Sequence, residues 1–445
     1  MKKICSLLFV LLFVFSLLPI TAQAEKDPIY DMVLDSQGVY VLNLETDTAL
    51  YEKAANTRMA PASTTKIMTA LVVLEQCESP ETELVTVPDT AMFSYIVEDG
   101  GVHMELSKGE NFTVYDLLLG MMMNSFCDAA DLLAYRFGDG NIDNFVKLMN
   151  DKAKELGLQN TNFENPHGLY EGNHYSSPRD IALFFKEAAK SEVFREIIST
   201  RNYTIPATAF HKARPLHYTV SSYYENNDYY LDCYIGGKSG FTDQSGRCLA
   251  TLSEKDGLSF ISVLLGANMD TSKRYPGNMA WIETRDLMAY AYEHFEVRTV
   301  LEQGAEVAKL PVTDSETVLS IIAAEEIRVL TRKDTEPYYT VSLPDRLSAE
   351  VVKDGAEVGK AQLYFNEEKG GSYPLVISWD GTPIVTKSAL EKGAKSAYDS
   401  VIGIFREDQV FVSLVIALLV VVGLCIPALA ITRKLQNKKI HRPKH

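Results

Sequence analysis

Hydrophobic and polar residues follow two different periods in the part of the chain before Val297. Alternating and apolar stretches predict a β-hairpin over residues 38–53 and strands at 230–237, 247–253 and 258–266. Apolar residues at helical spacing predict helices at about 63–75, 114–137, 141–156, 178–197 and 278–294. Strands at both ends of a segment, with helices between them, favour an α/β (α+β) domain whose antiparallel sheet pairs the two ends. We assign this domain to residues 25–296.

The pattern changes after Val297. Short β-rich stretches alternate there with Gly, Asp and Lys turns, at 305–310, 326–330, 338–343, 349–353 and 361–365. This texture predicts a small separate all-β domain over 297–385. Residues 386–409 are then expected to form a short stalk.

The N-terminal end is typical of an exported protein. Lys2 and Lys3 precede an almost unbroken apolar run that ends at Ile20, and the small residues Ala22 and Ala24 flank Gln23. This combination predicts a secretory signal peptide over residues 1–24, with the mature chain beginning at Glu25.

The C-terminal end carries a second apolar run, 410–432, without a charged residue. It is long enough to cross a bilayer as one helix, and six basic residues follow it in the tail 433–445. Because basic residues stay on the cytoplasmic side, the C-terminus is expected inside the cell and residues 25–409 outside. The sequence thus predicts a single-pass protein of the cell membrane.

The charge of the exported part argues against a nucleic-acid partner. The chain has 43 Lys and Arg against 59 Asp and Glu, and eight of the basic residues lie in the predicted signal and tail. The exported part keeps 35 basic residues and all the acidic ones, a formal charge of −24. Neither nucleic acid nor an anionic lipid surface is therefore expected to bind it.

Four cysteines fall in the exported part: Cys77, Cys127, Cys233 and Cys248. They are too scattered to predict a disulfide scaffold or a zinc site. One bridge between two of them stays open, and the spacing does not say which two.

Ser63-Thr64-Thr65-Lys66 is the first candidate for chemistry. An apolar run follows at 67–74, so Ser63 is predicted to begin a buried helix. Positions i and i+3 share one face of a helix, which brings the Lys66 amine beside the Ser63 hydroxyl. An amine whose pKa is lowered by burial can take the hydroxyl proton. An isolated S-x-x-K is more often a helix cap beside a solvated lysine, so this motif needs support from elsewhere in the chain.

Lys238-Ser239-Gly240 is the second candidate, within a strand that also contains Gly236 and Gly237. Glycines weaken a strand unless another group must approach its backbone closely. A strand with a cation, a hydroxyl and a bare backbone can bind an extended peptide and its terminal carboxylate. A glycine-rich hairpin edge is the alternative interpretation.

Together the two motifs resemble the serine penicillin-recognising enzymes, which combine S-x-x-K, S-x-N and K-[ST]-G in this order. The resemblance is closest to the low-molecular-weight penicillin-binding D-alanyl-D-alanine carboxypeptidases and spans roughly residues 28–390. The segments that carry it are 60–69, 116–121, 165–169, 173–176 and 237–242. It implies a penicillin-binding/β-lactamase-like transpeptidase fold, with an antiparallel sheet and a helical subdomain.

The resemblance also implies roles for individual residues. Ser63 is expected to be acylated, with Lys66 as its base and Ser125 as a proton relay to the leaving D-alanine. The backbone N–H groups of Ser63 and Phe241 are expected to form the oxyanion hole. The implied substrate-binding residues are Cys127, Lys238, Ser239, Gly240, Phe241, Thr242 and, through a loop alignment, Arg274. The implied partners are peptidoglycan stem peptides ending in D-Ala-D-Ala and β-lactams as covalent inhibitors, without a metal or cofactor.

The middle motif departs from the family pattern. Ser-x-Asn-Asp-Ala appears here as Ser125-Phe126-Cys127-Asp128-Ala129. An asparagine can donate to the substrate carbonyl and accept from the lysine, whereas a thiol does both poorly. A slow enzyme is therefore expected. His167 is interpreted as a structural loop residue that lines the site.

Three other functions stay open at this point. A β-lactamase needs a carboxylate that activates the deacylating water, and Glu164 is the only candidate near the motifs. An endopeptidase or transpeptidase has the same motifs, because acceptor choice depends on the shape of the pocket. A wall-binding or scaffolding protein with a degenerate site is supported only by Cys127.

Overall fold

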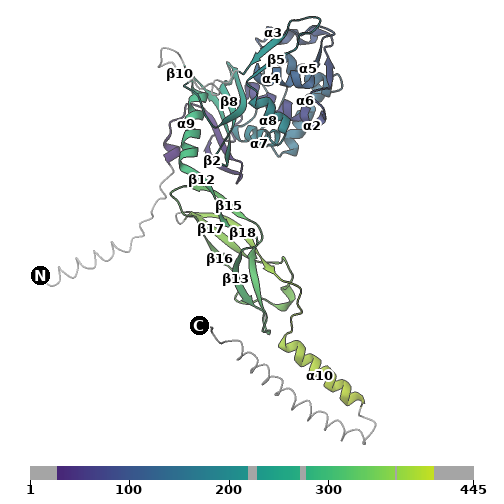
Figure 1. The fold of residues 1–445 in the computed structure, drawn as a ribbon, viewed down its shortest axis with the longest axis vertical. Helices are drawn as coiled ribbons and strands as arrows, with labels where there is room; N and C mark the ends of the chain where they lie inside the picture. The colour runs from purple at the N-terminus through teal and green to yellow at the C-terminus, as the bar shows by residue number, and fades with distance from the viewer. Residues whose placement is uncertain (1–27, 219–227, 271–276, 366–367, 405–445) are drawn as a thin grey trace, which may run out of the picture. The chain divides into compact units, whose positions relative to one another are not determined.

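The computed structural model describes residues 28–218, 228–270, 277–365 and 368–404 (Figure 1). The chain divides into two compact units. The first unit contains the chain up to Val300 together with 327–338 and 364–369, and the second contains 301–326, 339–363 and the chain from Gly370. The predicted signal peptide, membrane helix and basic tail lie outside the described residues. Within the described ranges, no helix is long and apolar enough to span a membrane.

The first unit is built on a five-stranded sheet in the order β2-β1-β9-β8-β7. Its strands are β1 (Gly38–Asn43), β2 (Thr48–Lys53), β7 (Tyr234–Thr242), β8 (Gly246–Lys255) and β9 (Leu258–Ala267). Every neighbouring pair is antiparallel, and β1 pairs with β9 so that Gly38 lies opposite Leu265. The sheet therefore joins the two ends of the domain, as the sequence predicts.

Helices cover both faces of this sheet (Figure 1). Helix α9 (Met279–His294) contacts β8 and β9, while α7 (Pro178–Ala188) contacts β1 and β9. All six residues of β1 are buried, as are nine of the ten in β9. A strand covered on both faces needs a nearly continuous apolar sequence.

The middle of the first unit is helical. Its helices are α2 (Lys66–Gln76), α3 (Ser94–Glu98), α4 (Val114–Met123), α5 (Cys127–Phe137), α6 (Ile142–Glu155) and α8 (Glu192–Ser199). Short antiparallel pairs flank them: β3 (Leu84–Thr86) with β4 (Asn111–Thr113), and β5 (Asn202–Ile205) with β6 (Arg214–His217). Another two-stranded pair is β10 (Met269–Asp270) with β11 (Gly277–Asn278).

Two predicted helices are each divided into two. The helix expected at 114–137 is broken before α5, where Ser125 adopts a left-handed backbone with φ 65°. The helix expected at 178–197 is broken at Ser191, whose side chain accepts the N–H of Phe194 and caps the start of α8. Apolar periodicity continues across both breaks, which is why it does not reveal them.

Strands dominate the chain after Phe295. β12 (Phe295–Leu301) pairs with β15 (Ile327–Arg332). A five-stranded sheet has the order β13-β14-β18-β17-β16, with β13 (Glu306–Pro311), β14 (Val318–Ala323), β16 (Tyr338–Ser342), β17 (Glu357–Phe365) and β18 (Glu368–Ser378). The all-β character is as predicted. The strand expected at 349–353 is wrong, because Ser348 caps a 3-10 turn at Ala349–Val351.

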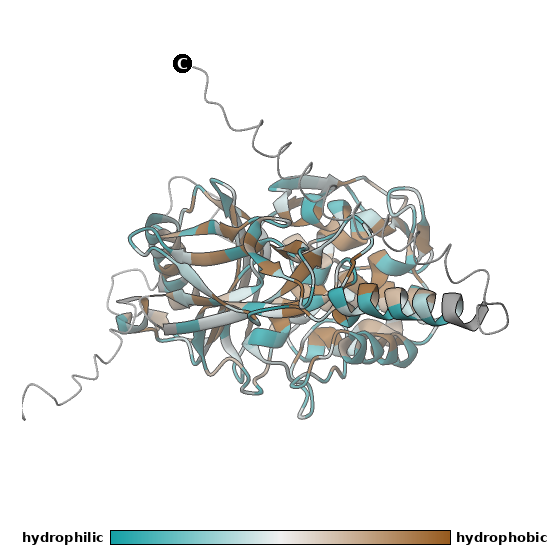
Figure 2. Cartoon of the chain, turned by 90° about the horizontal axis from the view of Figure 1, so that it is seen from below, coloured by the Kyte–Doolittle hydropathy of each residue, from teal (hydrophilic) through white to brown (hydrophobic). Residues whose placement is uncertain are grey.

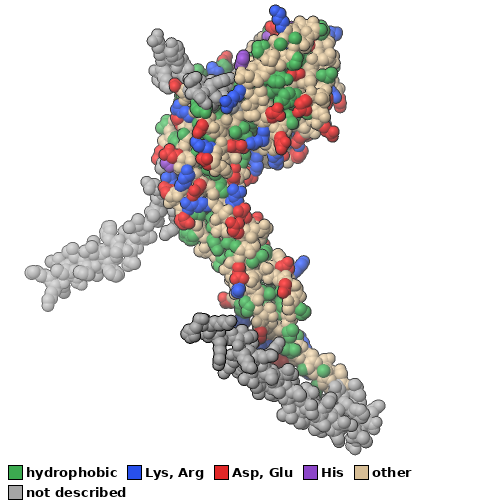
Figure 3. Space-filling model, in the orientation of Figure 1, with side chains coloured by type: hydrophobic (Ala, Val, Ile, Leu, Met, Phe, Trp, Pro, Cys, Tyr) green, Lys and Arg blue, Asp and Glu red, His purple; other side chains and the backbone are tan. Residues whose placement is uncertain are grey.

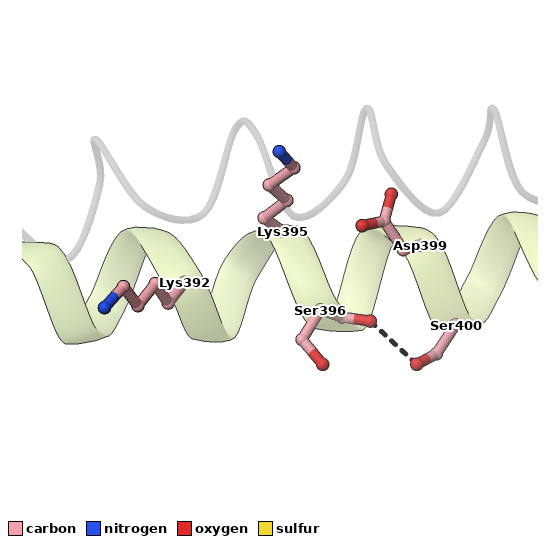
Figure 4. A pocket seen from close by; sticks show the side chains of 5 residues that line it. All are labelled: Lys392, Lys395, Ser396, Asp399 and Ser400. Atoms are coloured by element: carbon pink, nitrogen blue, oxygen red, sulfur yellow. Dashed lines mark hydrogen bonds between the residues drawn. The ribbon is translucent and has the colours of Figure 1, made fainter.

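The segment expected to be a stalk contains helix α10 (Lys387–Ile404). Its residues 387–400 are exposed, and hydrophilic residues recur along it (Figure 2). Figure 4 shows five of them, Lys392, Lys395, Ser396, Asp399 and Ser400, of which the Ser400 hydroxyl donates to the carbonyl of Ser396 at 2.7 Å. A polar, exposed helix of this kind has no core of its own.

Candidate active site

Ser63 lies in a 3-10 turn, Ala62–Thr65, that leads directly into α2. The predicted helix thus starts as a 3-10 turn and becomes α-helical only at Lys66. Ala62, the residue before the serine, has φ 47°, a left-handed conformation that is costly for a residue with a Cβ. The neighbouring elements must therefore hold this turn in place.

Lys66 is completely buried, and its amine faces the serine. Nζ donates to Ser63 Oγ at 3.0 Å, to the carbonyl oxygen of His167 at 2.6 Å and to Cys127 Sγ at 3.5 Å. Burial lowers the pKa of Lys66, although Cys127, Asp131 and Asp128 oppose this effect. Lys66 therefore loses its proton and becomes a neutral base at a lower pH than a solvated lysine does.

Ser125 reaches the same serine from the turn between α4 and α5. Its hydroxyl donates to Ser63 Oγ at 3.0 Å. Its left-handed backbone directs the chain into α5, whose first residue is the buried Cys127. In the middle motif, which differs from the family pattern at Cys127, Ser125 therefore contacts Ser63 and Cys127 contacts Lys66.

Strand β7 runs beside the turn that contains Ser63. A Cβ atom on Gly240 would lie 2.7 Å from the backbone nitrogen of Ser63, so only glycine permits this approach. Lys238 is buried, and its amine donates to the carbonyl of Ser239 at 2.8 Å. Burial, followed by the charge of Lys66, lowers the pKa of Lys238 well below the ordinary lysine value.

The outer end of β7 is more open. Ser239 and Thr242 are half-buried, whereas the Phe241 side chain is half exposed. The guanidinium of Arg247 on β8 lies 4.1 Å from the centre of the Phe241 ring, a cation–π contact. The Thr242 hydroxyl is hydrogen-bonded to Ser245 Oγ at 3.0 Å.

The loop between α6 and α7 closes the third side of the site. Gly168 has φ 87°, and a Cβ there would lie 1.9 Å from the carbonyl oxygen of Ala62. Asn165 holds the loop, since its Oδ1 accepts the N–H of Gly168 at 2.7 Å. The His167 ring is buried, while its backbone carbonyl is the one that binds Lys66.

The remaining positions considered from the sequence are Arg274, Glu164 and the four cysteines. Arg274 lies outside the described residues. The Glu164 carboxylate accepts the N–H of Asn173 at 3.1 Å and takes part in the loop. Cys77, Cys127, Cys233 and Cys248 are free thiols, and the described residues contain no group of His, Cys, Asp and Glu that could hold a metal ion.

The sequence alone does not indicate a role near Lys66 for Tyr95, Asp128 or Asp131. The Asp128 carboxylate accepts the N–H of Met104 with both oxygens, at 3.0 and 2.9 Å. Asp131 is completely buried and accepts the Tyr95 hydroxyl at 2.5 Å. Asp128 and Asp131 both lie on the apolar face of a predicted helix, and a carboxylate in that position is the sequence signal that could have indicated their role.

Comparison with known proteins agrees with this geometry. The sequence profile of the D-alanyl-D-alanine carboxypeptidase family matches residues 22–269, and that of the penicillin-binding protein 5 C-terminal domain matches residues 295–392. The D-alanyl-D-alanine carboxypeptidase DacF of Bacillus subtilis is 28% identical over 387 residues, which cover 85% of this chain and 95% of that protein. The D-alanyl-D-alanine carboxypeptidase of Streptomyces sp. strain K15 is 35% identical over 238 residues, covering 52% and 80%.

Solved structures give the same result. Penicillin-binding protein 5 from Haemophilus influenzae superposes with a TM-score of 0.64 at 24% identity, over 78% of this chain and 97% of that one, and so shows the fold. The Streptomyces K15 DD-transpeptidase superposes with a TM-score of 0.52 at 32% identity, over 59% and 98%. The profile match covers more than half of the chain, and the relatives and the lysine–serine geometry agree with it. The chain therefore belongs to the D-alanyl-D-alanine carboxypeptidase family.

Proposed function

We propose that this protein is a serine-type D-Ala-D-Ala carboxypeptidase that removes the terminal D-alanine from peptidoglycan stem peptides. The observation that carries the proposal is the pair of contacts at Ser63 Oγ, with the Lys66 amine and the Ser125 hydroxyl each at 3.0 Å. A serine hydroxyl is a weak nucleophile by itself and needs an adjacent base. The buried amine of Lys66 supplies one.

Acylation follows from these contacts. Lys66, as the free amine, takes the proton of Ser63 Oγ, which attacks the carbonyl carbon of the penultimate D-alanine. The N–H groups of Ser63 and Phe241 stabilise the oxyanion. Ser125 gives its hydroxyl proton to the nitrogen of the leaving D-alanine as the C–N bond breaks, and takes a proton from the Lys66 ammonium, which becomes the free amine again. In deacylation, Lys66 takes a proton from the attacking water and returns it to Ser63 Oγ as the bond between Oγ and the acyl carbon breaks.

Substrate binding uses the edge strand β7. The outer strands of the sheet are β2 and β7, so one edge of β7 is open to an extended peptide. The terminal carboxylate of the peptide is bound by Lys238, Ser239 and Thr242, with Arg274 as a further cation. Gly240 lets the peptide carbonyl reach the backbone of Ser63, since a side chain there would occupy that space.

Transfer to an amine acceptor is a second candidate reaction. The similar Streptomyces K15 structure is that of a DD-transpeptidase. An acceptor amine can replace water on the same acyl-enzyme. Hydrolysis of β-lactams is disfavoured because Glu164, the carboxylate considered for it, is bound within its own loop. β-Lactams are therefore proposed to be covalent inhibitors.

The proposal includes export and a membrane anchor. The signal-like run before Glu25 and the apolar run 410–432 with its basic tail support a single-pass topology with the catalytic domain outside. The β-rich domain over 297–385 is proposed to be non-catalytic, since no motif falls within it. A nucleic-acid partner is disfavoured by charge, and acidic and basic side chains are interspersed on the face shown in Figure 3.

The proposal is tested by D-alanine release from a D-Ala-D-Ala peptide, with and without an acceptor amine such as glycine. Wild type and Ser79→Ala, an exposed serine outside the site, should release D-alanine and bind fluorescent penicillin. Ser63→Ala should do neither. Release of D-alanine by a folded Ser63→Ala protein at the wild-type rate contradicts the proposal.

A further inference from the structure

A buried carboxylate lies behind Lys66 and takes no part in the mechanism above. Asp131, on α5, is completely buried, and its Oδ2 accepts the hydroxyl of Tyr95 at 2.5 Å. Its other oxygen, Oδ1, has no hydrogen-bond partner among the described residues. A buried carboxylate with one unpaired oxygen costs free energy, so its presence beside an active-site lysine calls for an explanation.

Hydrogen bonds connect this carboxylate to the lysine through His167. The Leu169 N–H donates to His167 Nδ1 at 3.1 Å, so the neutral ring carries its proton on Nε2. Nε2 then donates to the Tyr95 hydroxyl at 2.9 Å, and that hydroxyl donates to Asp131. The same histidine receives Lys66 Nζ on its backbone carbonyl at 2.6 Å. Asp131 is thus the last acceptor in a series of hydrogen bonds that holds His167, and the His167 carbonyl in turn binds Lys66.

The surroundings keep the histidine neutral and the aspartate titratable. Burial, followed by the charge of Lys66, lowers the pKa of His167 well below its ordinary value. Burial raises the pKa of Asp131 to about 7, while the Tyr95 bond and Lys66 act in the opposite direction. The titratable groups that face Asp131 from the elements packed around it are Lys66, Tyr95, Asp128, His167 and Glu171.

We propose that Asp131, acting through Tyr95 and His167, is a positioning residue for Lys66 and sets the pH at which this lysine becomes a free base. The inference rests on the proposed function, because it assigns a role in the Ser63 acylation. An ionised carboxylate near the lysine favours the ammonium form, so it moves the free amine to higher pH. Without that carboxylate the lysine loses its proton at lower pH, and His167 loses its tether.

The experiment measures the rate of acylation by a fluorescent penicillin between about pH 5 and pH 10, using the purified full-length chain. In wild type the rate should rise with pH as Lys66 is deprotonated. In Asp131→Asn this rise should move to lower pH by about one unit, and the plateau rate should fall about tenfold because the hydrogen-bond chain is weakened. Tyr95→Phe removes a bond that favours the ionised carboxylate, so it should move the rise in the same direction by less.

Tyr203→Phe is the matched control. The Tyr203 hydroxyl also donates to a buried aspartate, Asp116 on α4, at 2.9 Å, and that pair has no hydrogen bond to Lys66 or His167. This variant should keep the wild-type pH profile. The inference is overturned if Asp131→Asn and Tyr95→Phe melt as folded proteins and follow the wild-type profile. Should Asp131→Asn not fold, Tyr95→Phe decides alone, whereas a wild type that is not acylated at any pH overturns the proposed function itself.

Discussion

Cys127 makes the longest of the three Lys66 contacts, and its replacement by asparagine tests whether that contact limits the rate. Nζ lies 3.5 Å from the Cys127 sulfur, compared with 2.6 Å from the carbonyl oxygen of His167. A thiol is a weak acceptor, whereas an amide oxygen accepts from an amine at ordinary hydrogen-bond distance. The Asn NH₂ can also donate to the substrate carbonyl, which the thiol does poorly.

The size of the effect follows from these bonds. A hydrogen bond to a charged group contributes about 1.5–3 kcal/mol, and one preorganised donor in a transition state is worth about 3 kcal/mol. Cys127→Asn should therefore raise kcat/KM for a D-Ala-D-Ala peptide by about tenfold to a hundredfold. Asp128 is not free to take over this role, because the Met104 N–H occupies both of its carboxylate oxygens.

The assay compares kcat/KM of wild type, Cys127→Asn and Cys127→Ala. Cys233→Ala serves as the control, because Cys233 is an equally buried free thiol without a contact to Lys66. The reasoning is refuted if Cys127→Asn folds and shows no gain over wild type. That result would mean that Cys127 is only a small buried residue and that another group performs the polar role.

Three further predictions concern the loop, the topology and the β domain. Gly168→Ala should lower the free energy of unfolding by more than about 3 kcal/mol and abolish acylation, because its Cβ would lie 1.9 Å from the Ala62 carbonyl oxygen. The control Gly172→Ala should melt at nearly the wild-type temperature, because a Cβ at that position meets nothing within 4 Å. External protease on intact cells should release a soluble domain whose N-terminus is Glu25, and accessibility of residues 433–445 from outside would reverse the orientation. Ile321→Ala removes a completely buried side chain from β14 and should lower the melting temperature without changing the acylation rate, whereas slower acylation by a folded variant would mean that the β domain contributes to catalysis.

The sheet and its motifs could be predicted because their signals are local. Strands covered on both faces need apolar runs, and Gly240 marks the place where β7 meets the Ser63 turn. The breaks at Ser125 and Ser191 were missed because one depends on a left-handed backbone and the other on a serine cap, neither of which interrupts the apolar pattern. Strands β14 and β18 were also not predicted.

The environment of Lys66 could be predicted only in part. Ser63 is three residues away on the same turn, so its contact follows from helix geometry. Tyr95, Asp131 and His167 come from three segments distant in sequence, and only the folded chain brings them together. The domain boundaries and the roles of the site residues stay predictions.

The central claim is that Ser63 is the residue that becomes acylated. Its most direct test is to treat the purified chain with penicillin, digest it and identify the modified peptide by mass spectrometry. The account predicts one adduct, with the added mass of the opened β-lactam, on the Ser63 side chain, and none in Ser63→Ala. An adduct on any other residue, or an unchanged yield in Ser63→Ala, would contradict it.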